Sequence, residues 1–133
     1  MNDDDPHRMG TRPSERFEGD ERLIDLNAVV QQIHAEHAST HGHRQITVFK
    51  HDAVTIATFS FDENSGLPKH KANGIAVIMC LDGIISVTTP TQTHKMSANM
   101  MVILDPGVPH AVHAHELSRM LLTVCLSPRT AQP

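Results

Sequence analysis

The sequence of 133 residues contains little of several residue types that mark common protein classes. Tryptophan and tyrosine are absent and only four phenylalanines occur, so the core must be built mainly from aliphatic side chains and methionine. No apolar run approaches the roughly 20 residues that a membrane-spanning helix needs. Basic residues number 11 against 15 acidic ones, so no basic excess is available to neutralise nucleic-acid phosphates. We therefore expect neither a nucleic-acid partner nor a membrane partner.

Cysteine is also scarce. The two cysteines, Cys80 and Cys125, lie in apolar runs, and neither has a partner at the spacing of a zinc finger. We expect both to be buried, reduced thiols, as is usual in the cytosol. The chain begins with an acidic cluster at residues 3–5, where a signal peptide would carry basic residues before an apolar stretch. These features predict a cytoplasmic protein.

The first part of the chain has a different composition from the rest. Residues 1–22 contain seven acidic and four basic side chains and almost nothing apolar, which predicts a flexible acidic tail followed by one domain at residues 23–133. Apolar residues then recur at helical spacing, at positions 26, 29, 30 and 33. We predict one short helix over about residues 26–37, with Asp25 or Asn27 as its cap.

From Gln45 onward the pattern changes to short apolar or alternating runs separated by turn residues. This pattern is typical of an all-β sandwich or barrel. The sequence predicts strands at 46–50, 54–61, 75–81, 84–89, around 96, and at 100–104, 111–115 and 119–126. Asp82-Gly83 is predicted to form a tight hairpin between two of them. About eight such strands indicate a small jelly-roll barrel.

Two segments of this β region resemble the two sequence motifs of the cupin superfamily. The first motif can be written G-x5-H-x-H-x3-E-x6-G. His70 and Gly83 keep their places in it, whereas Ala72 and Ala76 stand where the second histidine and the glutamate would be. The resemblance implies an all-β, cupin-type double-stranded β-helix, a jelly-roll barrel with one short N-terminal helix.

The second motif can be written G-x5-P-x-G-x2-H-x3-N. This chain keeps Gly107 and His110, and Asn99 stands where the first glycine is expected. Asparagine can serve there because it accepts a positive φ at a turn. The chain is most similar to small single-domain bacterial cupins of uncharacterised function. The resemblance, together with the exposed edges of so small a barrel, also implies a homodimer.

A complete cupin site, the resemblance implies, holds a divalent metal such as zinc, nickel, manganese or iron on three histidines and a glutamate. Only His70 and His110 remain here, and metal sites of this kind normally have at least three protein ligands. If His110 points into the barrel, strand alternation places His113 and His115 on the opposite face. His94 is therefore the candidate for a third ligand.

Without a metal, the same residues describe a binding pocket. Ala72 and Ala76 leave space beside His70 and His110. Ile78 and Cys80 lie on the same strand face as Ala76 and would line the pocket together with the two alanines. Three functions stay open: a barrel that binds a small molecule in its lumen, a metal-dependent oxygenase or isomerase that uses the two histidines, and a structural or interaction barrel. The sequence does not decide whether the protein is an enzyme.

Overall fold

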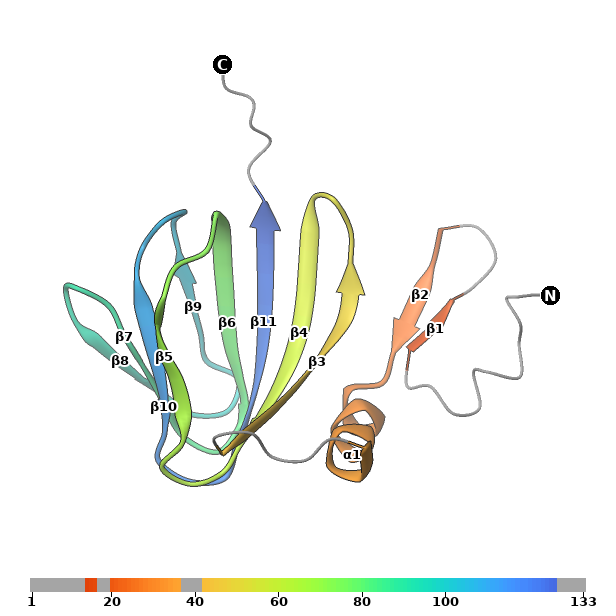
Figure 1. The fold of residues 1–133 in the computed structure, drawn as a ribbon, viewed down its shortest axis with the longest axis horizontal. Helices are drawn as coiled ribbons and strands as arrows, with labels where there is room; N and C mark the ends of the chain where they lie inside the picture. The colour runs from red at the N-terminus through yellow and green to blue at the C-terminus, as the bar shows by residue number, and fades with distance from the viewer. Residues whose placement is uncertain (1–13, 17–19, 37–41, 127–133) are drawn as a thin grey trace, which may run out of the picture.

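The structure, a computed structural model, describes residues 14–16, 20–36 and 42–126. Two antiparallel sheets face each other and form the barrel (Figure 1). The larger sheet has the order β3-β4-β11-β6-β9, and its strands are β3 (His43–Lys50), β4 (Val54–Phe61), β6 (Gly74–Asp82), β9 (Met101–Leu104) and β11 (Ser118–Leu126). The smaller sheet has the order β5-β10-β7-β8, and its strands are β5 (Gly66–His70), β7 (Ile85–Thr88), β8 (Thr93–Met96) and β10 (His110–Ala114). The prediction of an all-β barrel is confirmed.

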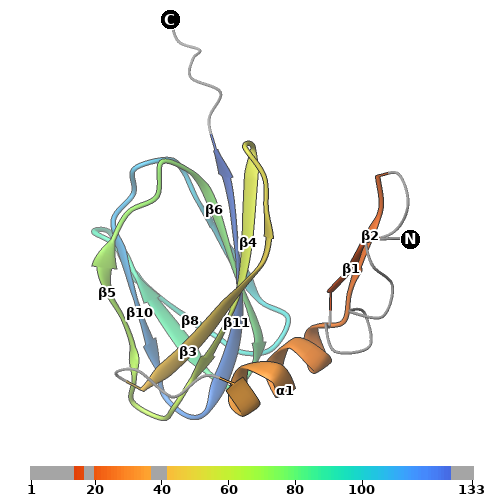
Figure 2. The same cartoon turned by 45° about the vertical axis from the view of Figure 1, so that its right-hand side comes forward.

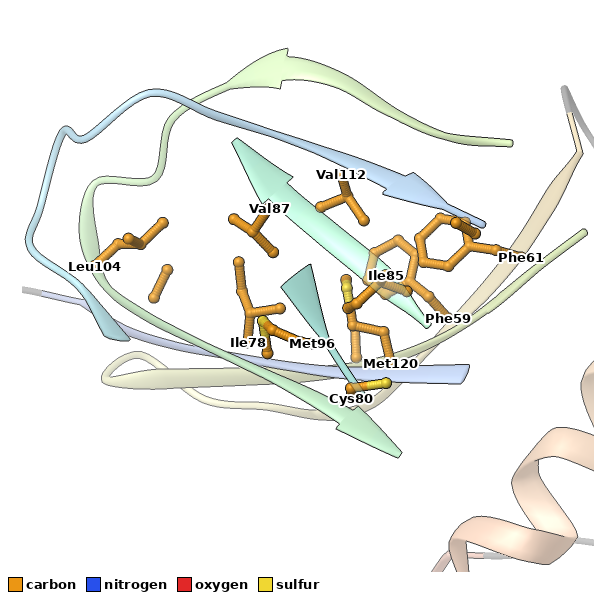
Figure 3. Close-up of a cluster of buried hydrophobic side chains, with 13 residues drawn as sticks. Phe59, Phe61, Ile78, Cys80, Ile85, Val87, Met96, Leu104, Val112 and Met120 are labelled. Carbon is orange, nitrogen blue, oxygen red and sulfur yellow. The ribbon is translucent and has the colours of Figure 1, made fainter. Parts of the chain in front are cut away.

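The core lies between the two sheets (Figure 3). Both sheets contribute side chains to this core, because every second residue of a strand points inward. Ile78 and Cys80 of β6 face Val87 of β7 and Val112 of β10 across the barrel, and all four side chains are at most 5% exposed. At one end, the rings of Phe59 and Phe61 stack with their centroids 5.8 Å apart. The scarcity of aromatic residues thus gives a mainly aliphatic core.

The predicted helix is present as α1 (Leu26–Glu36) and packs on the outer side of β3 and β4 (Figure 2). Its start is fixed by Asp25, whose Oδ1 accepts hydrogen bonds from the backbone N–H groups of Asn27 and Ala28, so Asp25 is the cap. Val29 and Ile33, one helical turn apart, are 1% and 0% exposed and form the buried stripe of the helix. No helix in the described part of the chain has the length and apolar character that crossing a membrane requires.

The segment predicted to be an acidic tail is structured at its end. Residues 1–13 lie outside the described residues, but β1 (Ser14–Arg16) pairs antiparallel with β2 (Arg22–Ile24). This two-stranded sheet could not be predicted from the polar composition of the segment, because each strand is only three residues long and contains an arginine. The Arg22 guanidinium carbon lies 5.4 Å from the centre of the Phe49 ring, a cation–π contact that connects β2 to the barrel.

Strand β5 (Gly66–His70) was not predicted from the sequence. Its glycine, proline and two charged or polar residues are poor strand formers. The strand forms because it lies at the edge of the smaller sheet, where Pro68 needs no partner for its missing N–H group. This missed strand carries His70 into the candidate site.

Two local predictions are wrong. Asp82-Gly83 does not close a hairpin, because β6 pairs with β9 and β11 whereas β7 pairs with β8 and β10; the turn leads the chain from one sheet to the other. Cys125 is exposed, because it occupies an outward position at the end of β11, while Cys80 is fully buried. Both cysteines are free thiols, as expected.

Candidate functional site

The two motif segments meet at one end of the barrel. The link from β5 to β6 and the link from β9 to β10 lie at the same end (Figure 1), and the backbone N–H of Gly107 donates a 2.9 Å hydrogen bond to the carbonyl oxygen of Ala72. Gly107 has φ 83°, a left-handed conformation that glycine adopts without strain. Asn99, which stands at the other motif glycine, has φ 71°, so the prediction of a positive φ there is confirmed.

This junction brings His70 and His110 together. They are direct partners in the register of β5 and β10, and their ring centroids are 4.3 Å apart with an angle of 60° between the planes. His110 is 2% exposed, whereas His70 is exposed at the barrel mouth. Val112 and Ala114 share the inward face with His110, and His113 and His115 are exposed on the other face, as strand alternation predicts.

A β-bulge between Leu67 and His70 aligns both residues with the inward face of β10. Two steps on β10, from His110 to Val112, correspond to three steps on β5, from His70 to Leu67. The extra residue resets the alternation of β5, so Leu67 and His70 both align with inward residues of β10. Leu67 accordingly packs against the hydrophobic core. Without the bulge, alternation would turn one of the two side chains outward.

Backbone carbonyl groups fix the protonation pattern of both rings. Nδ1 of His70 lies 2.9 Å from the carbonyl oxygen of Pro68, and Nδ1 of His110 lies 3.0 Å from that of Val108. A carbonyl oxygen only accepts hydrogen bonds, so each Nδ1 must carry the proton and donate. In the neutral rings, Nε2 is then left with a lone pair that can accept a hydrogen bond or bind a metal.

Burial favours the neutral form of His110. Removal of the ring from water lowers its pKa, the hydrogen bond to the Val108 carbonyl opposes this shift, and the neighbouring His70 lowers the pKa further. His110 is therefore a neutral imidazole at neutral pH, with Nε2 unprotonated. The predicted site has a hydrogen-bond acceptor at its buried end and a second histidine at its rim.

The other predicted pocket residues lie on the inner face of β6 or just before it. Ala72 is partly buried and packs against the core, and Ala76, Ile78 and Cys80 are 2%, 1% and 0% exposed within the core cluster. Ala72 and Ala76 are the two nearest in sequence to His70. Ile78 and Cys80 follow deeper in the barrel, where their side chains contact the packed core (Figure 3).

The structure does not bring His94 to the histidine pair. His94 pairs with Val87, which is itself aligned with Val112, so His94 lies on β8 at the far edge of the sheet from β5. Two strand spacings of about 4.8 Å separate β8 from β10, and His94 is aligned with Val112 and not with His110. Within the described residues, no group of three or more histidine, cysteine, aspartate or glutamate side chains is arranged to hold a metal.

Sequence reasoning missed a hydrogen-bonded pair on the outside of the smaller sheet. Ser86 Oγ lies 2.6 Å from Nε2 of His115, and the His115 ring meets His113 edge to face, with centroids 4.9 Å apart. The spacing of His113 and His115 predicts a shared face, but Ser86 comes from β7, 29 residues earlier in the chain. Only the register of β7 and β10 reveals it as their neighbour.

Comparison with known proteins gives a fold assignment. No family model matches the chain, and no curated protein matches it. Among solved structures, a conserved protein of unknown function from Streptococcus pyogenes is 23% identical, with a TM-score of 0.66 over 86% of this chain and 94% of that one. A cupin superfamily protein from Desulfitobacterium hafniense is 15% identical, with a TM-score of 0.67 over 86% of this chain and 98% of that one. The chain has the cupin fold.

A second cupin neighbour agrees with this assignment. The cupin 2 conserved barrel domain protein from Leptotrichia buccalis is 19% identical, with a TM-score of 0.64 over 78% of this chain and 47% of that one. Within the cupin barrel, His70 and His110 occupy the two motif positions that keep a histidine, while the other two ligand positions are Ala72 and Ala76. The donor set at the mouth therefore does not fit the four-ligand metal centre that the motif resemblance implies.

Proposed function

We propose that this cupin barrel binds a small organic molecule at its mouth, with His70 and His110 as the polar contacts. The observation that carries the proposal is the pair of imidazoles with centroids 4.3 Å apart, each with Nδ1 committed to a backbone carbonyl. Two Nε2 atoms are then free to contact one ligand, and a few polar groups beside apolar walls are typical of small-molecule sites. Alanines at positions 72 and 76 supply space instead of further donors.

The same groups define the chemistry of the ligand. Because both Nε2 atoms accept hydrogen bonds in the neutral rings, the ligand must offer hydrogen-bond donors such as hydroxyl or amino groups. Lys69 and Lys71 flank His70, and both are exposed at the rim. Their positive charge favours an anionic ligand at this end of the barrel. We therefore propose a small hydroxylated or amino-substituted carboxylic acid.

A metal-dependent enzyme of oxygenase or isomerase type is the second candidate. The fixed tautomers favour it, since a backbone carbonyl that holds Nδ1–H leaves Nε2 oriented as a ligand. Two protein ligands bind a first-row metal weakly, so zinc, nickel, manganese or iron would need a further donor from outside the described residues or from the substrate. We derive no reaction step through such a metal.

One experiment separates these functions. Protein expressed without a histidine tag and purified without a nickel column is analysed for metal, together with the variants His70→Ala and His110→Ala. His51→Ala, which removes an exposed histidine from the turn between β3 and β4, is the control. The same four proteins are then heated with a panel of hydroxy and amino acids, because a ligand that binds only the folded state raises Tm.

We expect no stoichiometric metal, and a rise of Tm with ligand concentration in the wild type and in His51→Ala but not in the two site variants. A rise that persists in both site variants would place the ligand elsewhere and contradict the proposal. Near-stoichiometric metal that is lost in both site variants would favour the metal-dependent enzyme. If the protein contains no metal and no compound raises its Tm, a structural or interaction barrel is favoured. That role is in keeping with the packed interior around Ile78 and Cys80.

We also propose that the protein is a cytoplasmic homodimer. Cys125 is an exposed free thiol, which a reducing compartment would preserve. The dimer is supported by β9, an edge strand whose outward side chains Met101 and Ile103 are 54% and 60% exposed. Ile75 on the neighbouring strand β6 is 41% exposed on the same face, as the register of the two strands requires.

A further inference from the structure

His113 and His115 form a second histidine pair, on the opposite face of β10 from His110. They alternate with Val112 and Ala114, which are 5% and 0% exposed, so both imidazoles stand on the outer face of the smaller sheet. Their centroids are 4.9 Å apart and their planes are nearly perpendicular, at 82°. The backbone N–H of His115 donates a 2.9 Å hydrogen bond to the carbonyl oxygen of Ile84, which anchors this end of the pair to the sheet.

Ser86 holds one of the two rings in place. It lies directly opposite His113 in the register of β7 and β10, is only 7% exposed, and has its Oγ 2.6 Å from Nε2 of His115. When Nε2–H of His115 donates to this hydroxyl oxygen, Nδ1 of the same ring carries the lone pair. A hydrogen bond to the far ring nitrogen is the arrangement by which metal-binding histidines are usually oriented.

On the other side of His113, the neighbouring position of β5 carries no side chain. The residue opposite His113 on β5 is Gly66, and a side chain there would collide with the backbone of Val112, so the position must remain glycine. At this register position His113 is therefore flanked by a glycine on the β5 side and by Ser86 on the β7 side.

We propose that His113 and His115 chelate a divalent transition metal on the outer face of the barrel, with Ser86 as the positioning residue for His115. Imidazole nitrogen suits copper, nickel and zinc. With only two protein ligands such an ion is bound weakly, and water fills its other coordination positions. In the tautomer in which Nε2–H donates to the Ser86 hydroxyl oxygen, Nδ1 of His115 is the ligating atom. The site shares no residue with the His70–His110 pair.

The test is a zinc titration of the full-length 15N-labelled protein, observed through the ring nitrogen signals of each histidine. Zinc is used because it is diamagnetic, so the signals of the ligating nitrogens shift without being lost. The dissociation constant is then measured for His113→Gln, His115→Gln and Ser86→Ala. His51→Gln, which removes an exposed histidine elsewhere, is the matched control. Circular dichroism verifies that each variant is folded.

We expect zinc to shift the ring signals of both His113 and His115, with ligation at Nδ1 of His115. His113→Gln and His115→Gln should each weaken binding at this site at least tenfold, since each removes one of only two protein ligands, and His51→Gln should leave it unchanged. Ser86→Ala should weaken binding about tenfold, the lower end of the effect of losing such a partner. Ring signals that do not shift, or unchanged affinity in either histidine variant, would overturn the site. Ligation through Nε2 of His115 would overturn the role of Ser86.

Discussion

At the scale of single residues, His110 combines two properties that usually exclude each other. It is a titratable group, and it is 2% exposed in the barrel interior. The cost of burying a charged imidazole lowers its pKa, and only the hydrogen bond to Val108 works against this effect. The neutral ring is thus the form that the fold accommodates, and the same form is the one that can accept a hydrogen bond from a ligand.

Stability should therefore depend on pH through His110. The unfolded chain binds a proton at this histidine near its ordinary pKa of 6.5, whereas the folded protein binds it only at lower pH. The unfolded state then holds more protons in this window, so the free energy of unfolding must fall as the pH decreases from above 6.5 to the lowered pKa. We expect urea unfolding at pH 7.5 and pH 5.0 to show a smaller loss of stability in His110→Gln than in the wild type.

The control for this prediction is His113→Gln, which removes an exposed histidine from the same strand. It should lose as much stability between the two pH values as the wild type does. If His110→Gln shows that same full loss, the pH dependence comes from other groups and the assignment to His110 is wrong.

At the scale of elements, two turn glycines with the same φ are required for different reasons. Gly83 and Gly107 both have φ 83°. A Cβ atom at Gly83 would collide with Oγ and Cα of Ser118 and with the carbonyl oxygen of Leu117, whereas a Cβ atom at Gly107 would meet nothing within 4 Å. Gly83 therefore serves close packing between the β6–β7 turn and β11 as well as turn geometry.

This difference predicts the result of substituting each glycine by alanine. Gly107→Ala should cost only the left-handed strain, about 1–2 kcal/mol in the free energy of unfolding. Gly83→Ala should cost about 1–3 kcal/mol more, because overpacking is added to the same strain. Chemical denaturation of the two variants beside the wild type measures the difference. Equal losses would mean that the contact with Ser118 relaxes without cost.

The elements also show which parts of the structure the sequence can predict. Strand β4 was predicted at its observed bounds, 54–61, because all its apolar residues except Ala57 are β-branched or aromatic. Strand β5 could not be predicted, since Pro68 and Gly66 are tolerated only because of its edge position. His70 and His110 were predicted from motif spacing, but the bulge that aligns them and the carbonyls that fix their tautomers depend on strand register. The Ser86–His115 contact depends on register in the same way.

At the scale of the whole molecule, the two barrel sheets have four edge strands, and among the described residues only β9 lacks a feature that blocks pairing with another chain. Lysine, proline or a covering helix usually blocks such edges. Strand β5 carries Pro68 and Lys69, β8 carries Lys95, and α1 packs against β3. Strand β9 has the sequence Met-Val-Ile-Leu, with neither charge nor proline.

This unprotected edge locates the proposed dimer interface, because a second copy of β9 could pair with it and cover its apolar outer face. Light scattering at micromolar concentration should give a particle of twice the 14.7 kDa chain mass. Ile103→Lys should shift the protein to the monomer, since it places a charge on a side chain that is 60% exposed on this face. Leu117→Lys is the matched control: Leu117 is 61% exposed but lies in the turn between β10 and β11, so that variant should stay dimeric. A monomeric wild type would refute the dimer, and a dimeric Ile103→Lys variant would place its interface on another strand.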